Sequence, residues 1–323
     1  MPTPDQILRT IRENPRVPAP SQAVAKILSL SKDPNCDTRK IAESISRDGA
    51  LTLQLLREVN SALYAGTRTT SSVQEACVRL GLKRVRAAVI NQQVVSGLGK
   101  ACPPGFHPHR YWQSALAISV AAHDLCKQLL PASAEDAGTA GLLCDIGIGL
   151  LAYGITDTYR PLLKEWYAAP QADLERIEHR ALGITHAQVG AAILTDWKLD
   201  PHLISAVEHH HDEPPVAAPG AEDRFERIVA AAVTISRIAL NGSDMEYVGR
   251  LYGQMEVLTP NADGVINKLL DTLVGHIQAS AESLAVEIGG TEEMASNFEE
   301  MGERMPNLAH CFSHKPMSRQ DLD

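Results

Sequence analysis

Four side chains in the second and third quarters of the chain could hold a metal ion: one carboxylate and three imidazoles. They are Asp145, His186, His210 and His211. Imidazole nitrogen and carboxylate oxygen are ligands that suit zinc, iron or manganese. His210 and His211 also stand near the end of an expected helix, where the helix dipole favours a cation. The four residues therefore raise the hypothesis of a metal site, which depends on whether the fold brings them together.

A second interpretation of these four residues needs no metal. Histidine and aspartate side chains in a helical core can simply hydrogen-bond with one another and with the backbone. The four residues show no spacing typical of a metal motif. On a regular helix His210 and His211 would point about 100° apart, because one turn takes about 3.6 residues. Spacing alone therefore favours the hydrogen-bonded core.

The elements that must position these side chains are helices. Apolar residues recur at i, i+3/i+4 spacing, as in Leu51, Leu55 and Val59, whereas alternating strand-like runs are hard to find. Thr185 before His186, and Asp200 before a proline, are typical helix starts. Two stretches rich in proline, 100–109 and 212–223, are expected to be connectors. The sequence predicts an all-α protein with roughly a dozen short to medium helices.

Composition excludes several classes of protein. The chain has 323 residues, of which 44% are hydrophobic and 21% are charged, as expected for a folded soluble protein. No apolar run of 18 residues exists, and the N-terminus lacks the apolar segment of a signal peptide. The six cysteines show no disulfide framework, and nucleotide-binding glycine loops are absent. We therefore expect a cytoplasmic protein with reduced thiols and no membrane contact.

The charge is divided unevenly along the chain. The net charge is -9, but residues 1–100 contain 15 Lys+Arg and 8 Asp+Glu, giving +7, whereas the rest contains 15 and 31, giving -16. Residues 281–323 alone contain nine acids and three bases. The simplest interpretation is two solvated surfaces of unlike composition, which could meet different partners.

Five segments in order resemble the HDOD family, a non-catalytic relative of the HD-domain metal-dependent phosphohydrolases. The quoted segments are VPAPSQAVAKIL, SRDGALTLQLLREVNSALY, SSVQEACVRLGLKRVRAAVI, AGLLCDIG and THAQVGAAILTDWKLDPHLISAVEHHH. The resemblance covers about residues 17–215. It implies an HDOD-like helix bundle with an N-terminal lobe to about residue 100 and a degenerate HD-like lobe over 110–215. A C-terminal helical extension would follow at about 224–290, and then an acidic, partly disordered tail over 291–323.

The resemblance also implies which ligands of the catalytic relatives are lost. Those enzymes use metal-activated water to attack a phosphoester. The four candidate ligands named above match retained positions. Three others do not: an early histidine corresponds to Ser114, the histidine of the His-Asp pair to Cys144, and the late aspartate, by register, to Val233. A two-ion hydrolytic centre is therefore not expected, although a single divalent ion could still be held.

The family resemblance implies a non-catalytic output or regulatory module of bacterial signal transduction, acting through an unknown signalling protein. Two alternatives stay open: a residual single-metal phosphohydrolase, and a sensor that binds a small anionic nucleotide in the degenerate pocket. Nucleic acid is not an expected partner, because no aromatic residues are interleaved with the basic ones. Lys83, Arg84 and Arg86 in the basic lobe are the candidate interaction face, which the acidic tail could mask.

Overall fold

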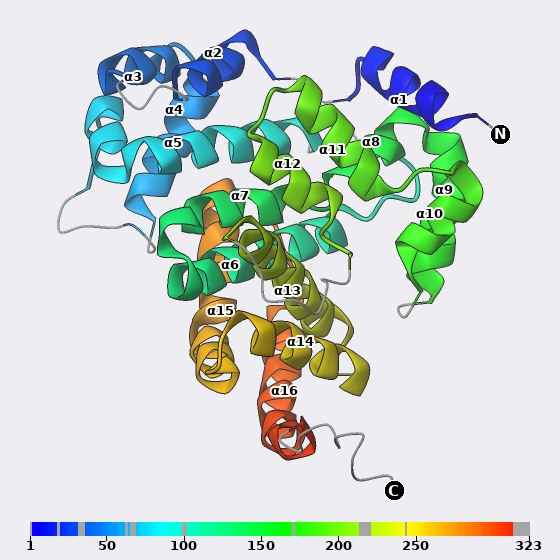
Figure 1. Ribbon diagram of the computed structural model, residues 1–323. Helices are drawn as coiled ribbons and strands as arrows, with labels where there is room; N and C mark the ends of the chain where they lie inside the picture. Colours follow the sequence, from blue (N-terminus) through cyan, green and yellow to red (C-terminus); the bar gives the residue numbers. More distant parts are fainter. Residues whose placement is uncertain are drawn as a thin grey trace, which may run out of the picture.

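The computed structural model describes residues 2–17, 20–31, 36–61, 64, 69–98, 102–169, 172–212, 221–242 and 244–312. Over these residues the protein contains helices and no strand, so the predicted all-α class is confirmed (Figure 1). The α-helices are α1 (Pro4–Glu13), α2 (Gln22–Ser31), α3 (Thr38–Ser46), α4 (Gly49–Asn60), α5 (Val73–Leu98), α6 (Pro108–Leu129), α7 (Ala134–Leu143), α8 (Ile146–Gly154), α9 (Thr156–Ala168), α10 (Leu174–Leu182), α11 (His186–Asp196), α12 (Pro201–Glu208), α13 (Ala221–Asn241), α14 (Met245–Leu258), α15 (Ala262–Leu284) and α16 (Thr291–Phe312). A short 3-10 turn, Pro131–Ser133, precedes α7.

Local sequence signals start and stop the helices near the site. The Thr185 side chain accepts a hydrogen bond from the backbone N–H of Gln188, whose side chain in turn accepts from the Thr185 N–H. This reciprocal cap begins α11 where the sequence predicts. The preceding helix, α10, ends at Gly183, which has a φ of 69°. That left-handed conformation favours glycine, so the glycine at position 183 determines where α10 ends.

Two groups of helices lie at opposite ends of the molecule, and α6 lies between them (Figure 1). Helices α2–α5 make one end and α13–α16 the other, while α6 packs against α7, α13 and α15. The first helix, α1, lies against α8 and α11 rather than with α2–α5, and buries Ile7 and Ile11 there. The described chain therefore shares one continuous hydrophobic core that runs through both ends.

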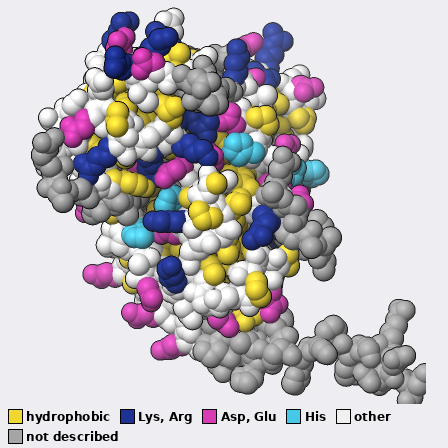
Figure 2. Space-filling model, turned by 60° about the vertical axis from the view of Figure 1, so that its left-hand side comes forward, with side chains coloured by type: hydrophobic (Ala, Val, Ile, Leu, Met, Phe, Trp, Pro, Cys, Tyr) yellow, Lys and Arg dark blue, Asp and Glu magenta, His cyan; other side chains and the backbone are white. Residues whose placement is uncertain are grey.

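The charge division of the sequence is also a division in space. The basic N-terminal residues build α1–α5, and much of the acidic excess lies on α14–α16 at the opposite end (Figure 1). Figure 2 shows Asp and Glu side chains along the lower part of one face, with most Lys and Arg side chains toward its upper end and middle. The two ends of the molecule thus present different charge to the solvent.

One stretch has the length and hydropathy of a membrane span. It runs from Pro131 to Gly154, covering α7 and α8, and its most apolar window is 94% buried inside the protein. The core helices of a folded protein produce the same pattern, because they are covered on all sides. The burial accounts for the apolar composition of the segment that contains Asp145.

The structure corrects the expected start of the disordered tail. Thr291–Phe312 form helix α16, which packs against α13 and α15 and buries Met294, Phe298 and Met301. These three residues follow helical i, i+4 and i+3 spacing, an apolar stripe that the surrounding acids obscure in the sequence. Residues 313–323 lie outside the described part of the chain.

Candidate metal site

The four candidate ligands come from three neighbouring helix ends. Asp145 lies between α7 and α8, His186 is the first residue of α11, and His210 and His211 follow α12. Helices α8 and α11 approach so closely that a Cβ atom on Gly147 would lie 1.9 Å from the backbone oxygen of His186. Only glycine allows this approach, which places His186 beside Asp145.

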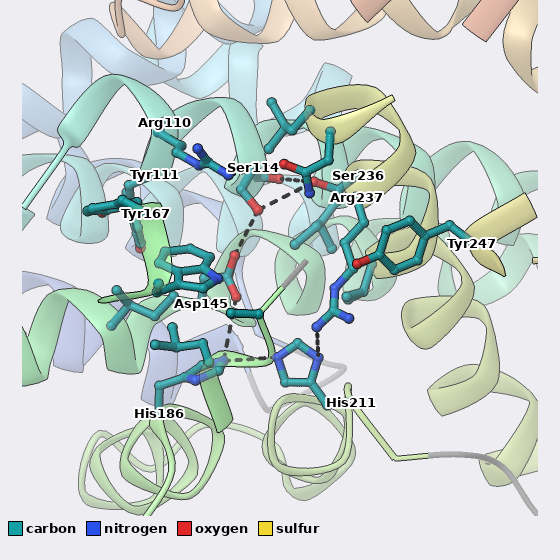
Figure 3. Close-up of a pocket in the computed structure, with 18 residues that line it drawn as sticks. Arg110, Tyr111, Ser114, Asp145, Tyr167, His186, His211, Ser236, Arg237 and Tyr247 are labelled. Carbon is teal, nitrogen blue, oxygen red and sulfur yellow. Dashed lines mark hydrogen bonds and ion pairs between the residues drawn. The ribbon is translucent and has the colours of Figure 1, made fainter. Parts of the chain in front are cut away.

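The structure brings all four side chains together. Figure 3 shows three of them: Asp145, His186 and His211. One ligand atom from each lies within 4.8 Å of those from the others. The Nε2 atoms of His186 and His211 are 3.0 Å apart, and Oδ1 of Asp145 is 3.8 Å from His186 Nε2 and 3.7 Å from His210 Nε2. One carboxylate oxygen and three imidazole nitrogens therefore lie close enough together to be considered as ligands of a single ion.

A buried carboxylate that the sequence analysis missed holds His186 in place. Oε2 of Glu178 accepts hydrogen bonds from both the backbone N–H and the Nδ1 atom of His186, at 2.7 and 2.8 Å. Tyr159 donates to the other oxygen of Glu178, which is fully buried. Burial lowers the pKa of His186, but the charge and hydrogen bond of Glu178, together with the charge of Asp145, outweigh it and raise that pKa to about 9. Glu178 follows the apolar Leu174 and Ile177 on α10, a signal that could have shown it faces inward.

His210 provides the test of whether these residues fit a metal ion. Its Nδ1 atom is 2.6 Å from the carbonyl oxygen of Val207, so Nδ1 donates and, in a neutral ring, Nε2 carries a lone pair. This Nε2 atom is buried and has no hydrogen-bond partner among the described residues. Since it faces the Asp145 carboxylate, two acceptor atoms oppose each other. A cation between them would remove that conflict, so His210 and Asp145 fit a single ion.

Arg237 on α13 constrains the fourth ligand. Its Nη2 atom donates to Nδ1 of His211 at 3.2 Å, because a guanidinium has donors only. In a neutral ring the proton then lies on Nε2 of His211, which faces His186 at 3.0 Å. Burial, with the neighbouring positive charges, lowers the pKa of His211 well below its ordinary value, so the ring is neutral at pH 7. His211 can therefore bind an ion through Nε2 only if its contact with Arg237 is given up.

The three positions expected to lack ligands lie at the same site. Ser114 donates its hydroxyl to Oδ2 of Asp145 at 2.9 Å. Val233 lines the cavity beside the cluster, and Arg237 follows one helical turn later, a spacing that could have drawn attention to it. Cys144 is fully buried, and burial raises the pKa of its thiol well above the ordinary value. Cys144 is also not among the side chains whose ligand atoms converge at the site.

The structure corrects the predicted basic interaction face. Arg84 pairs with Glu58 and Glu135, and its side chain is only 16% exposed. Arg86 similarly pairs with carboxylates of Asp136 and Asp200 and is 15% exposed. Lys83, 59% exposed, is the accessible member of the three, and its Nζ atom donates to the carbonyl of Ala132. The sequence shows correctly how many basic residues this segment contains. In the folded protein, however, both arginines pair with acidic residues from other segments.

Lowering the pH is expected to remove the stabilisation that Glu135 provides. Burial alone would raise the pKa of Glu135, but its contacts with His123 and Arg84 lower it from 4.5 to about 2. The contribution is therefore complete above pH 4.5 and is lost as the pH falls toward 2. We expect Glu135→Gln to cost about 2 kcal/mol at pH 7 by urea unfolding, with a difference that shrinks below pH 4.5. A difference that is the same at pH 7 and pH 3 would contradict the assignment.

Comparison with known proteins identifies the family. Residues 17–213, more than half of the chain, match the HDOD domain. This chain belongs to the HDOD family. The predicted resemblance to that family is therefore confirmed.

Solved structures of similar proteins share the fold. An HDOD domain protein of unknown function from Geobacter sulfurreducens superposes with a TM-score of 0.69 at 20% identity, covering 86% of this chain and 98% of that one. A provisionally assigned phosphohydrolase from Shewanella amazonensis SB2B gives 0.67 at 26%, covering 86% and 97%. A provisionally assigned signal transduction protein from Marinobacter aquaeolei VT8 gives 0.63 at 20%, covering 87% and 65%. HDOD membership fits a regulatory role, and these neighbours show that the fold is shared.

A curated relative is much longer than the matched region. An uncharacterised protein of Treponema pallidum is 25% identical over 201 residues, which is 60% of this chain. The match spans 38% of that relative's length.

Proposed function

We propose that this HDOD chain is a regulatory module of signal transduction that acts by binding another protein and does not hydrolyse phosphoesters. The observation that carries the proposal is the set of residues at the three altered ligand positions. A neutral serine hydroxyl, a buried protonated thiol and a valine stand where catalytic HD relatives supply two imidazoles and a carboxylate. The remaining donor set has a single carboxylate, which is too little negative charge for two divalent ions and a bridging hydroxide.

The position of Arg237 supports the same proposal. Its guanidinium contacts His211 at the edge of the cluster. A fixed positive charge beside a metal ligand repels a further divalent cation, since like charges at short distance in a partly buried site are weakly screened. Because the proposed function involves no catalysis, residues on the surface of the helix bundle must recognise the partner.

Absence of turnover is the first test. The purified chain, supplied in turn with Mn²⁺, Fe²⁺ and Zn²⁺, is assayed with bis-(p-nitrophenyl) phosphate, cyclic dinucleotides and nucleoside phosphates. We expect rates equal to those of the Asp145→Asn variant, because neither protein can activate water between two ions. A rate above background that disappears in Asp145→Asn would contradict the proposal and favour the phosphohydrolase alternative.

Protein binding is tested separately, by crosslinking the tagged chain in its host cell and identifying the partner by mass spectrometry. The partner is then titrated into the purified chain by calorimetry. We expect Asp145→Asn to bind that partner with unchanged affinity. If no purified protein binds the chain directly, the interaction part of the proposal is wrong.

A second candidate role, supported by the unpartnered Nε2 atom of His210, is that of a single-ion structural site. Asp145, His186 and His210 would hold the ion, and Glu178 and the Val207 carbonyl would orient the two rings, as outer partners of metal-binding histidines do. When bound, a divalent ion supplies positive charge that joins α8, α11 and the end of α12. This role fits a module that does no chemistry.

Metal content distinguishes this second role from a hydrogen-bonded core. Protein purified without chelator is expected to contain about one equivalent of a divalent metal by mass spectrometry, and His210→Ala to contain less than about a fifth. EDTA should lower the melting temperature of the wild type by several degrees but not that of His210→Ala, because only a bound ligand stabilises the folded state. The matched control is His209→Ala, since His209 is the exposed neighbour. Equal metal content in the wild type and His210→Ala would contradict the site.

A further inference from the structure

A partly open cavity of about 70 Å³ lies beside the ligand cluster. Its walls come from α6, α8, α9, α13 and α14, with α10 and the ends that carry His186 and His211 (Figure 3). We propose that this cavity binds a small oxyanion, with inorganic phosphate as the type case, through Arg110, Arg237 and Tyr111. The inference goes beyond the proposed function and does not depend on it.

Two arginines supply the positive charge of the cavity. Arg237 donates to the neutral ring of His211, and Arg110 donates to Oδ1 of Asn241 at 3.0 Å. Neither has a carboxylate within ion-pair distance among the described residues, unlike Arg84 and Arg86, each of which has two. A partly buried guanidinium normally has an anionic partner, because burying an unpaired charge is costly. The missing partner of both arginines is therefore an anion.

Arg110 is held ready for such a ligand. Its guanidinium lies 5.6 Å from the ring centres of both Trp166 and Tyr167, within the range of a cation–π contact. These contacts, with the hydrogen bond to Asn241, restrict its side chain before any ligand arrives. A restricted arginine loses less conformational entropy on binding, which favours affinity for an oxyanion.

Tyr111 provides an independent observation. The residue lines the cavity, is only 5% exposed, and its hydroxyl has no hydrogen-bond partner among the described residues. A buried hydroxyl without a partner is destabilising, so such groups are rare without an unseen acceptor. Burial raises the pKa of this hydroxyl well above its ordinary value, so it stays a donor. An oxyanion in the cavity would supply the acceptor that it lacks.

Asp145 is the acidic residue among those that line the cavity, and its charge is already compensated. Its Oδ2 atom accepts the hydroxyl proton of Ser114, and its Oδ1 atom faces the rings of His186 and His210. With the two arginines included, positive charge exceeds negative charge around the cavity. The lining therefore favours an anion even with Asp145 ionised.

The volume determines the size of the anion. A water molecule needs about 10–15 Å³ on this measure, so 70 Å³ holds roughly five water molecules, comparable to the five non-hydrogen atoms of phosphate. Pockets for larger ligands are about 300–1,000 Å³. The inner part of the cavity thus has room for an oxyanion of phosphate size, whereas the rest of a nucleotide would extend beyond it.

Calorimetric titration of the full chain tests the proposal. EDTA-treated protein is titrated with phosphate in chloride buffer at constant ionic strength, with AMP as the size control. We expect one saturable phosphate site and at least tenfold weaker binding in Arg237→Gln and in Arg110→Gln, since each removes a charge-assisted hydrogen bond. Tyr111→Phe, which keeps the ring and the fold, should weaken binding several-fold. AMP should bind at least tenfold more weakly than phosphate.

Arg224→Gln is the matched control. Arg224 is also partly buried on α13, donates to the carbonyl of Leu258, and does not line the cavity. Phosphate affinity in this variant should equal that of the wild type. The proposal is overturned by folded wild-type protein that does not bind phosphate, by equal losses in Arg224→Gln and Arg237→Gln, or by AMP that binds more tightly than phosphate. None of these outcomes affects the hydrolysis assay, so the proposed function is judged separately.

Discussion

Gly147→Ala is expected to lower the free energy of unfolding by about 3 kcal/mol or more, among the largest effects of any single methyl group in this protein. The added Cβ would lie 1.9 Å from the backbone oxygen of His186 and 2.6 Å from its carbonyl carbon. Because both neighbours are backbone atoms, no side-chain rotation can relieve the overlap. Helix α11 must move away from α8, which also separates His186 from Asp145. Urea unfolding followed by circular dichroism measures the loss.

Gly275→Ala is the matched control for this prediction. Gly275 lies within α15, and an added Cβ there would meet no atom within 4 Å. Alanine has the higher helix propensity, so the substitution should stabilise the protein by about 0.5–1 kcal/mol. If Gly147→Ala is as stable as the wild type, the close approach of α8 and α11 is wrong, and with it the geometry of the ligand cluster.

Arg84→Met is expected to cost about 3–4 kcal/mol. Arg84 lies between Glu58 on α4 and Glu135 on α7, whose side chains are 7% and 25% exposed. Removing the guanidinium leaves two carboxylates in a poorly hydrated site without their countercharge, which is more costly than losing an exposed pair. The same contact joins the N-terminal helices to the centre of the bundle, so the loss should appear as a lower unfolding midpoint in urea.

Arg9→Met serves as the control, because Arg9 and its partner Glu13 are 79% and 67% exposed. That substitution should change stability by less than about 0.5 kcal/mol. A triple variant, Arg84→Met with Glu58→Gln and Glu135→Gln, should recover much of the loss, since no uncompensated charge then remains. Equal effects of Arg84→Met and Arg9→Met would show that the buried pairing is absent in solution.

Features that depend on neighbouring residues in the chain were predictable. The helical period gave the all-α class, and Thr185 marked the start of α11, since a helix cap requires only residues a few positions apart. Gly81, with a φ of 76°, interrupts α5 in a left-handed conformation that favours glycine. The motif matches located the candidate ligands, although spacing alone favoured a core without metal.

Features that depend on partners far away in the chain were not predictable. Counting charges suggested that Arg84 and Arg86 form a free basic face, but their carboxylate partners lie between 26 and 114 residues away. The stripe on α16 was hidden for a similar reason: Met294 and Phe298 identify a buried face only once α13 and α15 are in place to cover it.

The same distinction applies to the site. The chain's residue types alone show that Asp145 and His186 are retained and that Ser114 replaces a ligand, because identity at a motif position is a local property. Packing brings in Glu178 behind His186 and Arg237 beside His211, neither of which any motif indicated. Helix α13 is separated from α11 by a connector and a further helix, so its contact with the site depends on how the bundle closes. That closure places Val233 and Arg237 beside the ligand cluster, where they line the cavity for which we propose an anion.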